Sequence, residues 1–469
     1  KGVPVVALKT GSSSVGSELT VSHTGSLSGS AEMYEALFAR VGIISVTNPS
    51  QFLETLKFLC VVGAPKGKKL VGFTCSGGGA TMLADHAEKI DLNFLPVEPS
   101  REIELAKLLP EIATVSNPLD YTTPIWGQPN LTYPMFAKAI TVIEADTAVL
   151  VQDYPAEGLD ASKIFYQRDA AAFAQAAKEQ GLPAVICSTL PENMDEQTRQ
   201  FLISVGVAPM QGIHETLNAI HAASNWLEAR HRILLAEPQP LLPSWEWCEQ
   251  AIVTEDESKL WLETNGFPVP VGRVVSAQKV CAAASEVGYP VALKMISPLL
   301  PHKTEAGAVV LNLRDSDTLF RATTQMTVDV ASYNPKAATD IFLVEAMSPT
   351  PLAELIITLR RDPQFGAGLV LGSGGILVEL VGDVVTLLLP TSPDNIESAI
   401  QTLRVGWLLE GFRGRPMADI KNIASQINRL CIAYLENYAI ISEIEINPLF
   451  VYADKVCAVD ALIHRPVLT

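Results

Sequence analysis

The sequence predicts an α/β protein with parallel sheets, followed by a separate α+β region. Residues 66–230 alternate apolar, strand-like runs with helical patterns, and this alternation is typical of parallel βαβ units. Residues 235–250 are rich in proline, which favours a linker, and hairpin-like runs follow from about residue 250. A chain of 469 residues is also too long for a single hydrophobic core, so several domains are expected.

The elements of the first region follow from its apolar periodicity. Residues 1–65 are expected to form a strand at Val3–Leu8, a loop of small residues, a helix over 30–41, a short strand and a helix over 49–62. The alternation that follows predicts strands at Lys69–Cys75, Ala148–Gln152 and Ala184–Ser188, and helices at Ala80–Lys89, Ala161–Gln180 and Gln211–Arg230.

The second region begins with a helix signal. Thr254 precedes three acidic residues, and this pattern is typical of an N-cap followed by a negatively charged first turn. We expect the helix to continue over Ser258–Asn265 and to end at Gly266. The remaining residues predict an α+β region that ends with a strand at Val456–Leu462.

The composition excludes several classes of function. The net charge of −17 disfavours non-specific binding to nucleic acids or anionic membranes, since such binding needs a basic surface. The seven cysteines are odd in number and widely spaced, without a CxxC pair, so neither a disulfide framework nor a zinc site is expected. The sequence contains no apolar run of about 18 residues, and we expect a soluble, cytoplasmic protein.

One histidine lies in an unusual local sequence. His23 is surrounded by serine, threonine and glycine between Ser22 and Ser30. Small neighbours let the backbone approach a ligand and leave the imidazole accessible, and an accessible imidazole is a nucleophile near neutral pH. A mobile turn that happens to contain a histidine is the alternative interpretation of this segment.

A glycine-rich turn joins the strand at Lys69–Cys75 to the next helix. The turn has the sequence Ser76-Gly77-Gly78-Gly79. Because free backbone N–H groups and the helix dipole meet at such a terminus, it predicts an anion-binding site. An ordinary tight turn between a strand and a helix is the alternative.

The motifs, taken in order, resemble one enzyme family. Residues Pro4–Gly11, the SHTGSLSG segment around His23, and the segments Ala36–Phe38 and Gly42–Ile44 are similar to the phosphohistidine segment of the ADP-forming acyl-CoA synthetases, relatives of succinyl-CoA synthetase. The similarity continues across nearly the whole chain. It implies flavodoxin-like succinyl-CoA synthetase domains followed by an α+β ATP-grasp domain. The implied domains are residues 1–65 (the C-terminal part of the phosphohistidine-bearing domain), 66–234 (a second flavodoxin-like CoA-ligase domain), 235–250 (a linker) and 251–469 (the ATP-grasp domain).

The resemblance gives roles to residues of the first region. In this family the histidine equivalent to His23 carries a phosphoryl group, and the same role is implied here. The phosphate or substrate site that faces it would include Ser76, Gly77, Gly78, Gly79 and Asn117. Trp126 lies just beyond the segment Asn117–Tyr121 and would either line an acyl pocket or have a structural role.

The C-terminal region resembles an ATP-grasp domain of the same family. The strand Tyr289–Lys294 carries a lysine at its end, and the segment His302–Val309 departs only mildly from the family pattern. Nucleotide binding is implied for Lys294, Lys303, Glu345, Glu354, Gly374, Gly375 and Arg413. His302 is either a second phosphoryl carrier or a phosphate-contacting or structural histidine.

The resemblance also implies a Mg²⁺ site. In relatives of succinyl-CoA synthetase, the residues equivalent to Asn447 and Asp460 bind this ion, and Glu379 is a further candidate ligand. Hard oxygen ligands near nucleotide phosphates suit Mg²⁺. A chance grouping of acidic and amide residues at strand ends is the alternative.

The expected activity is that of an ADP-forming acid–CoA ligase: carboxylate + ATP + CoA ⇌ acyl-CoA + ADP + phosphate, through a phosphohistidine and an acyl phosphate. The expected ligands are ATP or ADP, Mg²⁺, CoA and a small carboxylic acid that the sequence does not identify. A non-catalytic or regulatory protein of this fold, including part of a lysine acetyltransferase fusion, is the alternative.

In fused members of the family a CoA-binding domain comes first. We therefore expect a companion segment or subunit to pack on residues 1–65, and we also expect a homo-oligomer.

Overall fold

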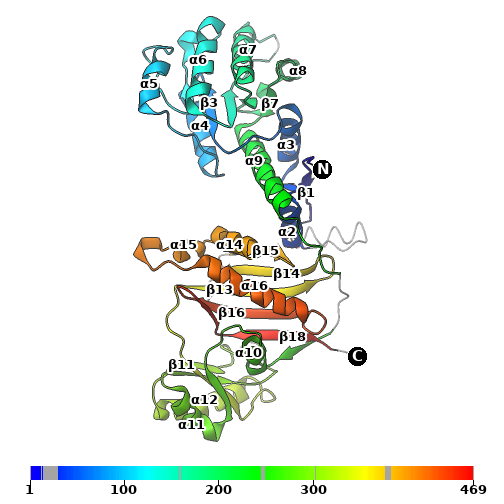
Figure 1. The fold of residues 1–469 in the computed structure, drawn as a ribbon, viewed down its shortest axis with the longest axis vertical. Helices are drawn as coiled ribbons and strands as arrows, with labels where there is room; N and C mark the ends of the chain where they lie inside the picture. Colours follow the sequence, from blue (N-terminus) through cyan, green and yellow to red (C-terminus); the bar gives the residue numbers. More distant parts are fainter. Residues whose placement is uncertain are drawn as a thin grey trace. The chain divides into compact units, whose positions relative to one another are not determined.

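The structure is a computed structural model that describes residues 2–11, 13, 30–156, 158–159, 161–243, 249–300, 303–374 and 382–467. The chain divides into two compact units (Figure 1). The first unit comprises Lys1–Ala31 and Phe38–Glu237, and the second comprises Glu32–Leu37 and Pro238–Thr469. None of the helices in the described ranges combines the length and the apolar character that a membrane crossing requires.

The first unit is built on a parallel sheet of five strands in the order β4-β3-β5-β6-β7. The strands are β3 (Leu70–Thr74), β4 (Leu119–Asp120), β5 (Thr147–Val151), β6 (Ala184–Ser188) and β7 (Ala208–Gln211). The helices are α3 (Pro49–Val61), α4 (Gly77–Glu88), α5 (Pro99–Ala106), α6 (Pro129–Ile143), α7 (Lys163–Glu179), α8 (Glu196–Ser204) and α9 (Ile213–Leu235). The predicted alternation and the parallel sheet are confirmed.

Helices cover both faces of this sheet, and the strands are therefore apolar throughout. Along β3, Leu70 belongs to one hydrophobic core while Val71 and Phe73 belong to the other, as the two-residue period of a strand requires. Helices α3, α4 and α9 supply the first core, and α6 and α7 supply much of the second. Phe58 of α3 is fully buried in the first core, so the helix predicted over 49–62 is part of this packing.

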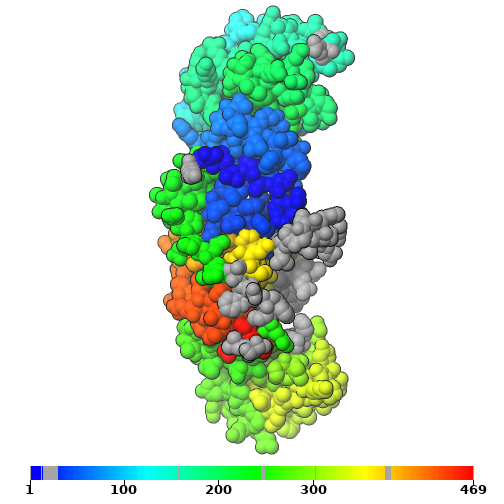
Figure 2. All heavy atoms as spheres, turned by 90° about the vertical axis from the view of Figure 1, so that its right-hand side faces the viewer, coloured from blue at the N-terminus to red at the C-terminus, as the bar shows by residue number. Residues whose placement is uncertain are grey.

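The N-terminal segment forms a smaller sheet. Strands β1 (Val6–Leu8) and β2 (Ile44–Val46) pair in parallel, and α2 (Ala31–Val41) lies between them in the sequence. In the part of the chain that the structure describes, neither strand has another neighbour. The dark-blue atoms of the first residues lie on the surface in Figure 2. The strand predicted at Val3–Leu8 is shorter than expected because only Val6–Leu8 have a partner strand to bond.

The second unit contains two antiparallel sheets. The smaller has the strand order β11-β10-β12-β9, with β9 at Gly272–Ser276, β10 at Val291–Met295, β11 at Val309–Leu313 and β12 at Ile341–Ala346. Helices α11 (Val280–Val287) and α12 (Ser316–Tyr333) share a hydrophobic core with it. The β-rich α+β region predicted from the sequence is confirmed.

The larger sheet has the order β15-β14-β13-β16-β18-β8, and β17 pairs with β16. Its strands are β8 (Gln250–Val253), β13 (Ala353–Asp362), β14 (Gly366–Ser373), β15 (Val384–Leu388), β16 (Glu443–Val451), β17 (Val456–Ala458) and β18 (Ala461–Pro466). The remaining helices are α10 (Glu255–Thr264), α14 (Pro393–Thr402), α15 (Gly406–Leu409) and α16 (Ile420–Glu436). Between Leu235 and Gln250 no described residue belongs to a helix or strand, and the linker over 235–250 stays a prediction.

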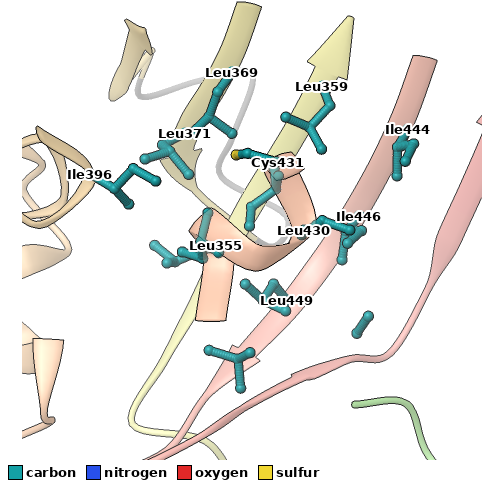
Figure 3. Packing of buried hydrophobic residues seen from close by; sticks show 14 of the residues in the cluster. Leu355, Leu359, Leu369, Leu371, Ile396, Leu430, Cys431, Ile444, Ile446 and Leu449 are labelled. Carbon is teal, nitrogen blue, oxygen red and sulfur yellow. The ribbon is translucent and has the colours of Figure 1, made fainter. Parts of the chain in front are cut away.

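Helix α16 packs across one face of the larger sheet (Figure 1). Figure 3 shows Leu430 and Cys431 of this helix against leucine side chains of β13 and β14. These residues are 2 % exposed or less, so the sheet has a dense apolar core on this side. The buried charged residues of the second unit, Glu255, Lys259, Lys294 and Glu345, lie on α10, β10 and β12 instead.

Candidate functional site

The glycine-rich turn of the first unit opens helix α4. Ser76 is the N-cap residue and Gly77 the first helical residue, so the helix begins three residues earlier than the predicted Ala80. The Ser76 carbonyl accepts the N–H groups of Gly79 and Ala80. The N–H groups of Gly77 and Gly78, both exposed, find no acceptor among the described residues. They can therefore receive an anion, as the sequence predicts.

Gly79 is required by the close approach of helix and strand. A Cβ atom on this residue would lie 2.6 Å from the Thr74 hydroxyl oxygen, which is too short for a real contact. The same hydroxyl accepts a hydrogen bond from the Ser76 N–H at 3.2 Å. Gly79 is thus a packing residue that allows Gly77 and Gly78 to present their N–H groups at the end of β3.

Asn117 cross-links the start of β3 to its neighbouring loops. Its side-chain oxygen accepts the Gly72 N–H at 3.0 Å, and its amide nitrogen donates to the Leu70 and Leu95 carbonyls at 2.9 Å each. Both amide hydrogens and the oxygen are therefore used inside the fold. A substrate-binding role for Asn117 stays a prediction.

Trp126 lies in an aromatic cluster with α7. Its ring is 4.7 Å from the ring of Tyr166 and 5.5 Å from that of Phe165. Its Nε1 atom is buried without a hydrogen-bond acceptor in the described structure. The next residue, Gly127, donates its N–H to the buried carboxylate of Asp169. The ring packing gives Trp126 a structural role, and the unpaired N–H leaves the acyl-pocket prediction open.

The second unit brings together four residues that the sequence singled out. Lys294 lies on β10 and Glu345 on the adjacent strand β12, where Ala292 pairs with Glu345. Because residues two apart share one face of a strand, Lys294 and Glu345 are diagonal neighbours. Lys303 and Asp460 approach from loops, with their charged atoms 3.0 Å apart. Glu345 is itself part of β12, one residue before the end of the strand at Ala346.

Two further residues, Glu255 and Lys259, complete this cluster. Both lie on α10, one helical turn apart, and their charged atoms are 2.8 Å from each other. Lys259 also contacts Glu345 at 2.5 Å. The sequence alone predicts only a helix-terminal role for the acids after Thr254. The spacing of Glu255 and Lys259 by four residues was the signal that could have suggested a shared helix face.

Lys294 is held by three partners within the fold. Its ammonium contacts Glu255 at 2.5 Å and Glu345 at 3.1 Å, and it donates to the Val459 carbonyl at 3.0 Å. Lys303 contacts both Glu255 and Asp460 and is more exposed, with 13 % of its side chain accessible. An incoming anion therefore meets Lys303 first and reaches Lys294 only by exchanging one of its contacts.

Opposing effects set the protonation of this cluster. Burial alone would raise the pKa of the Glu255 carboxyl, but the charges of Lys294, Lys259 and Lys303 hold that pKa well below its usual range. Burial alone would lower the pKa of Lys294, and the facing carboxylates, Glu255 foremost, raise it instead. The pKa of Lys303 is raised in the same way by Asp460 and Glu255. All three groups are therefore charged at neutral pH.

Asn447 and Asp460 are adjacent through their backbones, since the Asn447 N–H donates to the Asp460 carbonyl at 3.3 Å. The Asp460 side chain is 35 % exposed and holds Lys303. No group of three or more His, Cys, Asp or Glu residues suited to a metal occurs in the described ranges. Mg²⁺ is often bound by one or two protein oxygens together with phosphates and water, so this pair fits the predicted ion.

The other predicted residues are not joined to this cluster. The Gly374 N–H donates to the Glu354 carbonyl at 2.7 Å, so these two are neighbours through the backbone. Arg413 stacks its guanidinium on the ring of Phe412, and within the described ranges no ion pair links it to the carboxylates of the cluster. His23, His302, Gly375 and Glu379 lie outside the described residues.

Comparison with known proteins agrees with these observations. Residues 247–464 match the family model of an ATP-grasp domain, and residues 1–59 match that of the succinyl-CoA ligase-like flavodoxin domain. The β subunit of ADP-forming acetate–CoA ligase I from Pyrococcus furiosus is 34 % identical over 216 residues, which cover 46 % of this chain and 92 % of that subunit.

Longer relatives match nearly all of this chain. ADP-forming acetate–CoA ligase I from Archaeoglobus fulgidus is 28 % identical over 97 % of the chain and 65 % of its own length. ADP-forming 4-hydroxybutyrate–CoA ligase from Nitrosopumilus maritimus is 26 % identical over 96 % of the chain and 64 % of its own length. The chain thus spans somewhat less than two thirds of these relatives.

The buried ion pairs predict a large effect of one substitution on stability. Lys294→Met would leave Glu255 and Glu345 with one counter-ion fewer, and breaking a buried pair costs about 3–5 kcal/mol. The control is Arg273→Met on β9, whose contact with Glu286 is 3.9 Å long and exposed, with an expected cost below about 1 kcal/mol. Urea unfolding of the full chain measures the free energy of unfolding of both variants. Equal losses would show that the ion pairs of Lys294 do not stabilise the fold.

Proposed function

Because this chain belongs to the family of the ADP-forming acyl-CoA synthetases, we propose that it supplies the phosphoryl-transfer part of the reaction carboxylate + ATP + CoA ⇌ acyl-CoA + ADP + phosphate. The observation that carries the proposal is the convergence of Lys294, Lys303 and Asp460 within a domain of ATP-grasp type. Two lysines beside an oxygen ligand for Mg²⁺ suit a nucleotide polyphosphate.

The proposed chemistry proceeds in three steps. An imidazole nitrogen of His23 attacks the γ-phosphorus of ATP and ADP leaves. A carboxylate oxygen of the substrate then attacks the phosphohistidine, the P–N bond breaks, and an acyl phosphate forms. Finally the CoA thiol, losing its proton, attacks the acyl carbon and phosphate leaves. A carboxylate is a poor electrophile, and these steps give it a leaving group.

The residues of this chain would divide the work between the two units. Gly77 and Gly78 would hold the phosphoryl group while it is transferred to or from His23, and Trp126 would contact the acyl part. Nucleotide contacts are proposed for Lys303 and Lys294, with Glu345, Glu354, Gly374, Gly375 and Arg413. His302 is proposed as a second phosphoryl carrier or as a phosphate contact.

Asn447 and Asp460 would hold Mg²⁺, with Glu379 as a further ligand. When bound, this ion neutralises part of the phosphate charge and so supports transfer of the terminal phosphoryl group. The substrate is proposed to be a small carboxylic acid. The relatives named for acetate and for 4-hydroxybutyrate differ in the size of that acid, so the family leaves the choice open.

We propose further that a companion segment or subunit packs on the sheet of β1 and β2. A parallel sheet of two strands is marginal, since parallel sheets are normally covered on both faces and at their edges. Val3 and Val5 are 73 % and 52 % exposed beside this sheet. The companion would supply the CoA-binding domain, and a homo-oligomer of the whole assembly is also proposed.

The free thiols of the six described cysteines support a location in the cytoplasm.

Phosphoryl transfer to His23 can be followed by labelling. Incubation with γ-labelled ATP and Mg²⁺ should attach a label that is lost in acid and stable in base, as for a phosphoramidate. The His23→Ala variant should lack it. His302→Ala tests the relay: if label still reaches His23, His302 is not an obligatory carrier. Equal labelling of the His23→Ala variant and the parent chain would reject the proposal.

The nucleotide product distinguishes the proposed reaction from an AMP-forming one. Transfer of the terminal phosphoryl group requires ADP, so chromatography of the nucleotides should find ADP and no AMP. Asp460→Ala should reduce Mg²⁺-dependent turnover at least about tenfold while the circular dichroism spectrum stays unchanged. Release of AMP and pyrophosphate would show that the chemistry is of another kind.

The proposed companion segment or subunit should be needed for CoA binding. The chain of 469 residues should bind CoA weakly and form acyl-CoA slowly by itself. Adding the N-terminal third of an ADP-forming relative as a separate polypeptide should restore both. A Val5→Lys variant, altered in the exposed N-terminal segment, should respond less to that addition. Tight CoA binding and full turnover by the chain alone would make a companion unnecessary.

A further inference from the structure

One carboxylate lies at the centre of the charged cluster in the second unit. The Oε1 atom of Glu255 contacts the ammonium groups of Lys294 and Lys259 at 2.5 and 2.8 Å, and its Oε2 atom contacts Lys303. Glu345 contacts two of these lysines and Asp460 contacts one. In the described structure, Glu255 is thus the residue that all three lysines share.

The position of Glu255 follows from the start of α10. The helix begins at this residue, directly after the N-cap Thr254, so its side chain leaves from the first turn. Lys259 follows one turn later on the same face. Lys294 comes from β10, and Lys303 comes from the loop before β11. Glu255 therefore joins three separate segments of the chain at one point.

The charges of the cluster balance. Three lysines face three carboxylates, those of Glu255, Glu345 and Asp460. The Glu255 side chain is 0 % exposed, whereas those of Lys303 and Asp460 are 13 % and 35 % exposed. The open side of the cluster is therefore at Lys303 and Asp460, and Glu255 lies behind the lysines, where it is shielded from an entering ligand.

A buried lysine needs a carboxylate partner to keep its charge and to hold a fixed position. Ammonium groups held close together repel one another, and an unpaired buried lysine tends to lose its proton. A lysine side chain also has four rotatable bonds, so a charged group with no fixed contact would spread over many positions. Glu255 fixes two ammonium groups, those of Lys294 and Lys303, next to each other.

We propose that Glu255 is a positioning residue for nucleotide binding: it does not touch the nucleotide, but holds Lys294 and Lys303 together so that both can reach one polyphosphate. This inference rests on the proposed function, because it takes the cluster to be the phosphate site. Lys259 then acts as the internal counter-ion that completes the charge balance on the buried side.

The test separates position from charge. In Glu255→Gln three lysines face two carboxylates, and the unfolding midpoint should fall. In the double variant Glu255→Gln with Lys259→Met, two lysines face two carboxylates, and the midpoint should recover. If Glu255 positions the lysines, the double variant should still bind a non-hydrolysable ATP analogue with Mg²⁺ at least about tenfold more weakly than the parent chain by calorimetry. Glu263→Gln, an exposed glutamate on the same helix, is the control and should change neither quantity.

Three outcomes decide the matter. Parent-like affinity of the double variant would overturn the proposal, because charge balance alone would then suffice. Tighter binding by Glu255→Gln would also overturn it, since Glu255 would then compete with phosphates for the lysines. Failure of the parent chain itself to bind the analogue would instead refute the proposed nucleotide site. Glu255→Asp gives an internal check, as a shorter carboxylate should keep stability better than affinity.

Discussion

The pairing of buried charges is the constraint on which the second unit depends. Lys259 and Lys294 are almost fully enclosed, and their charges are tolerated only because Glu255 and Glu345 lie in contact with them. Those carboxylates come from a helix and a strand that are far apart in sequence, so the ion pairs also fix α10 against β10 and β12. The alternation of the strands completes this arrangement, since Leu293 and Val344 point into the hydrophobic core while Lys294 and Glu345 point away from it.

In the first unit, backbone hydrogen bonds and close packing fix the geometry of the candidate site. The turn after β3 places unpaired N–H groups at a helix N-terminus, and the close packing at Gly79 makes that geometry possible. Other candidate side chains of this unit carry structural bonds. Asn117 holds the start of β3, and Asp169 accepts the N–H of Gly127 beside Trp126. Some residues that the sequence assigns to the candidate site therefore also make hydrogen bonds that stabilise the surrounding fold.

Under the proposed function, the two units would hold phosphate by different means. The first offers backbone N–H groups, which are neutral and fixed by the fold. The second offers lysine ammonium groups, which carry full charge but need carboxylates to keep them in place. A protein with a net charge of −17 needs such local arrangements to attract a polyphosphate. The β1–β2 sheet has no further strand among the described residues, and the proposed companion segment would pack there.

The sequence by itself determined the fold classes, most helices and strands, and the family, because these depend on local periodicity and on motifs whose order survives in one dimension. It also named Lys294, Lys303, Glu345 and Asp460, which the structure brings together. Only the tertiary structure decided that Glu255 and Lys259 complete the cluster, that Lys294 is held by Glu255, Glu345 and the Val459 carbonyl, and that the amide of Asn117 is bonded within the scaffold. The physical reason is that a hydrogen bond or ion pair is set by distance in space. Glu255 and Lys303 are 48 residues apart in the chain, and no local pattern records their contact.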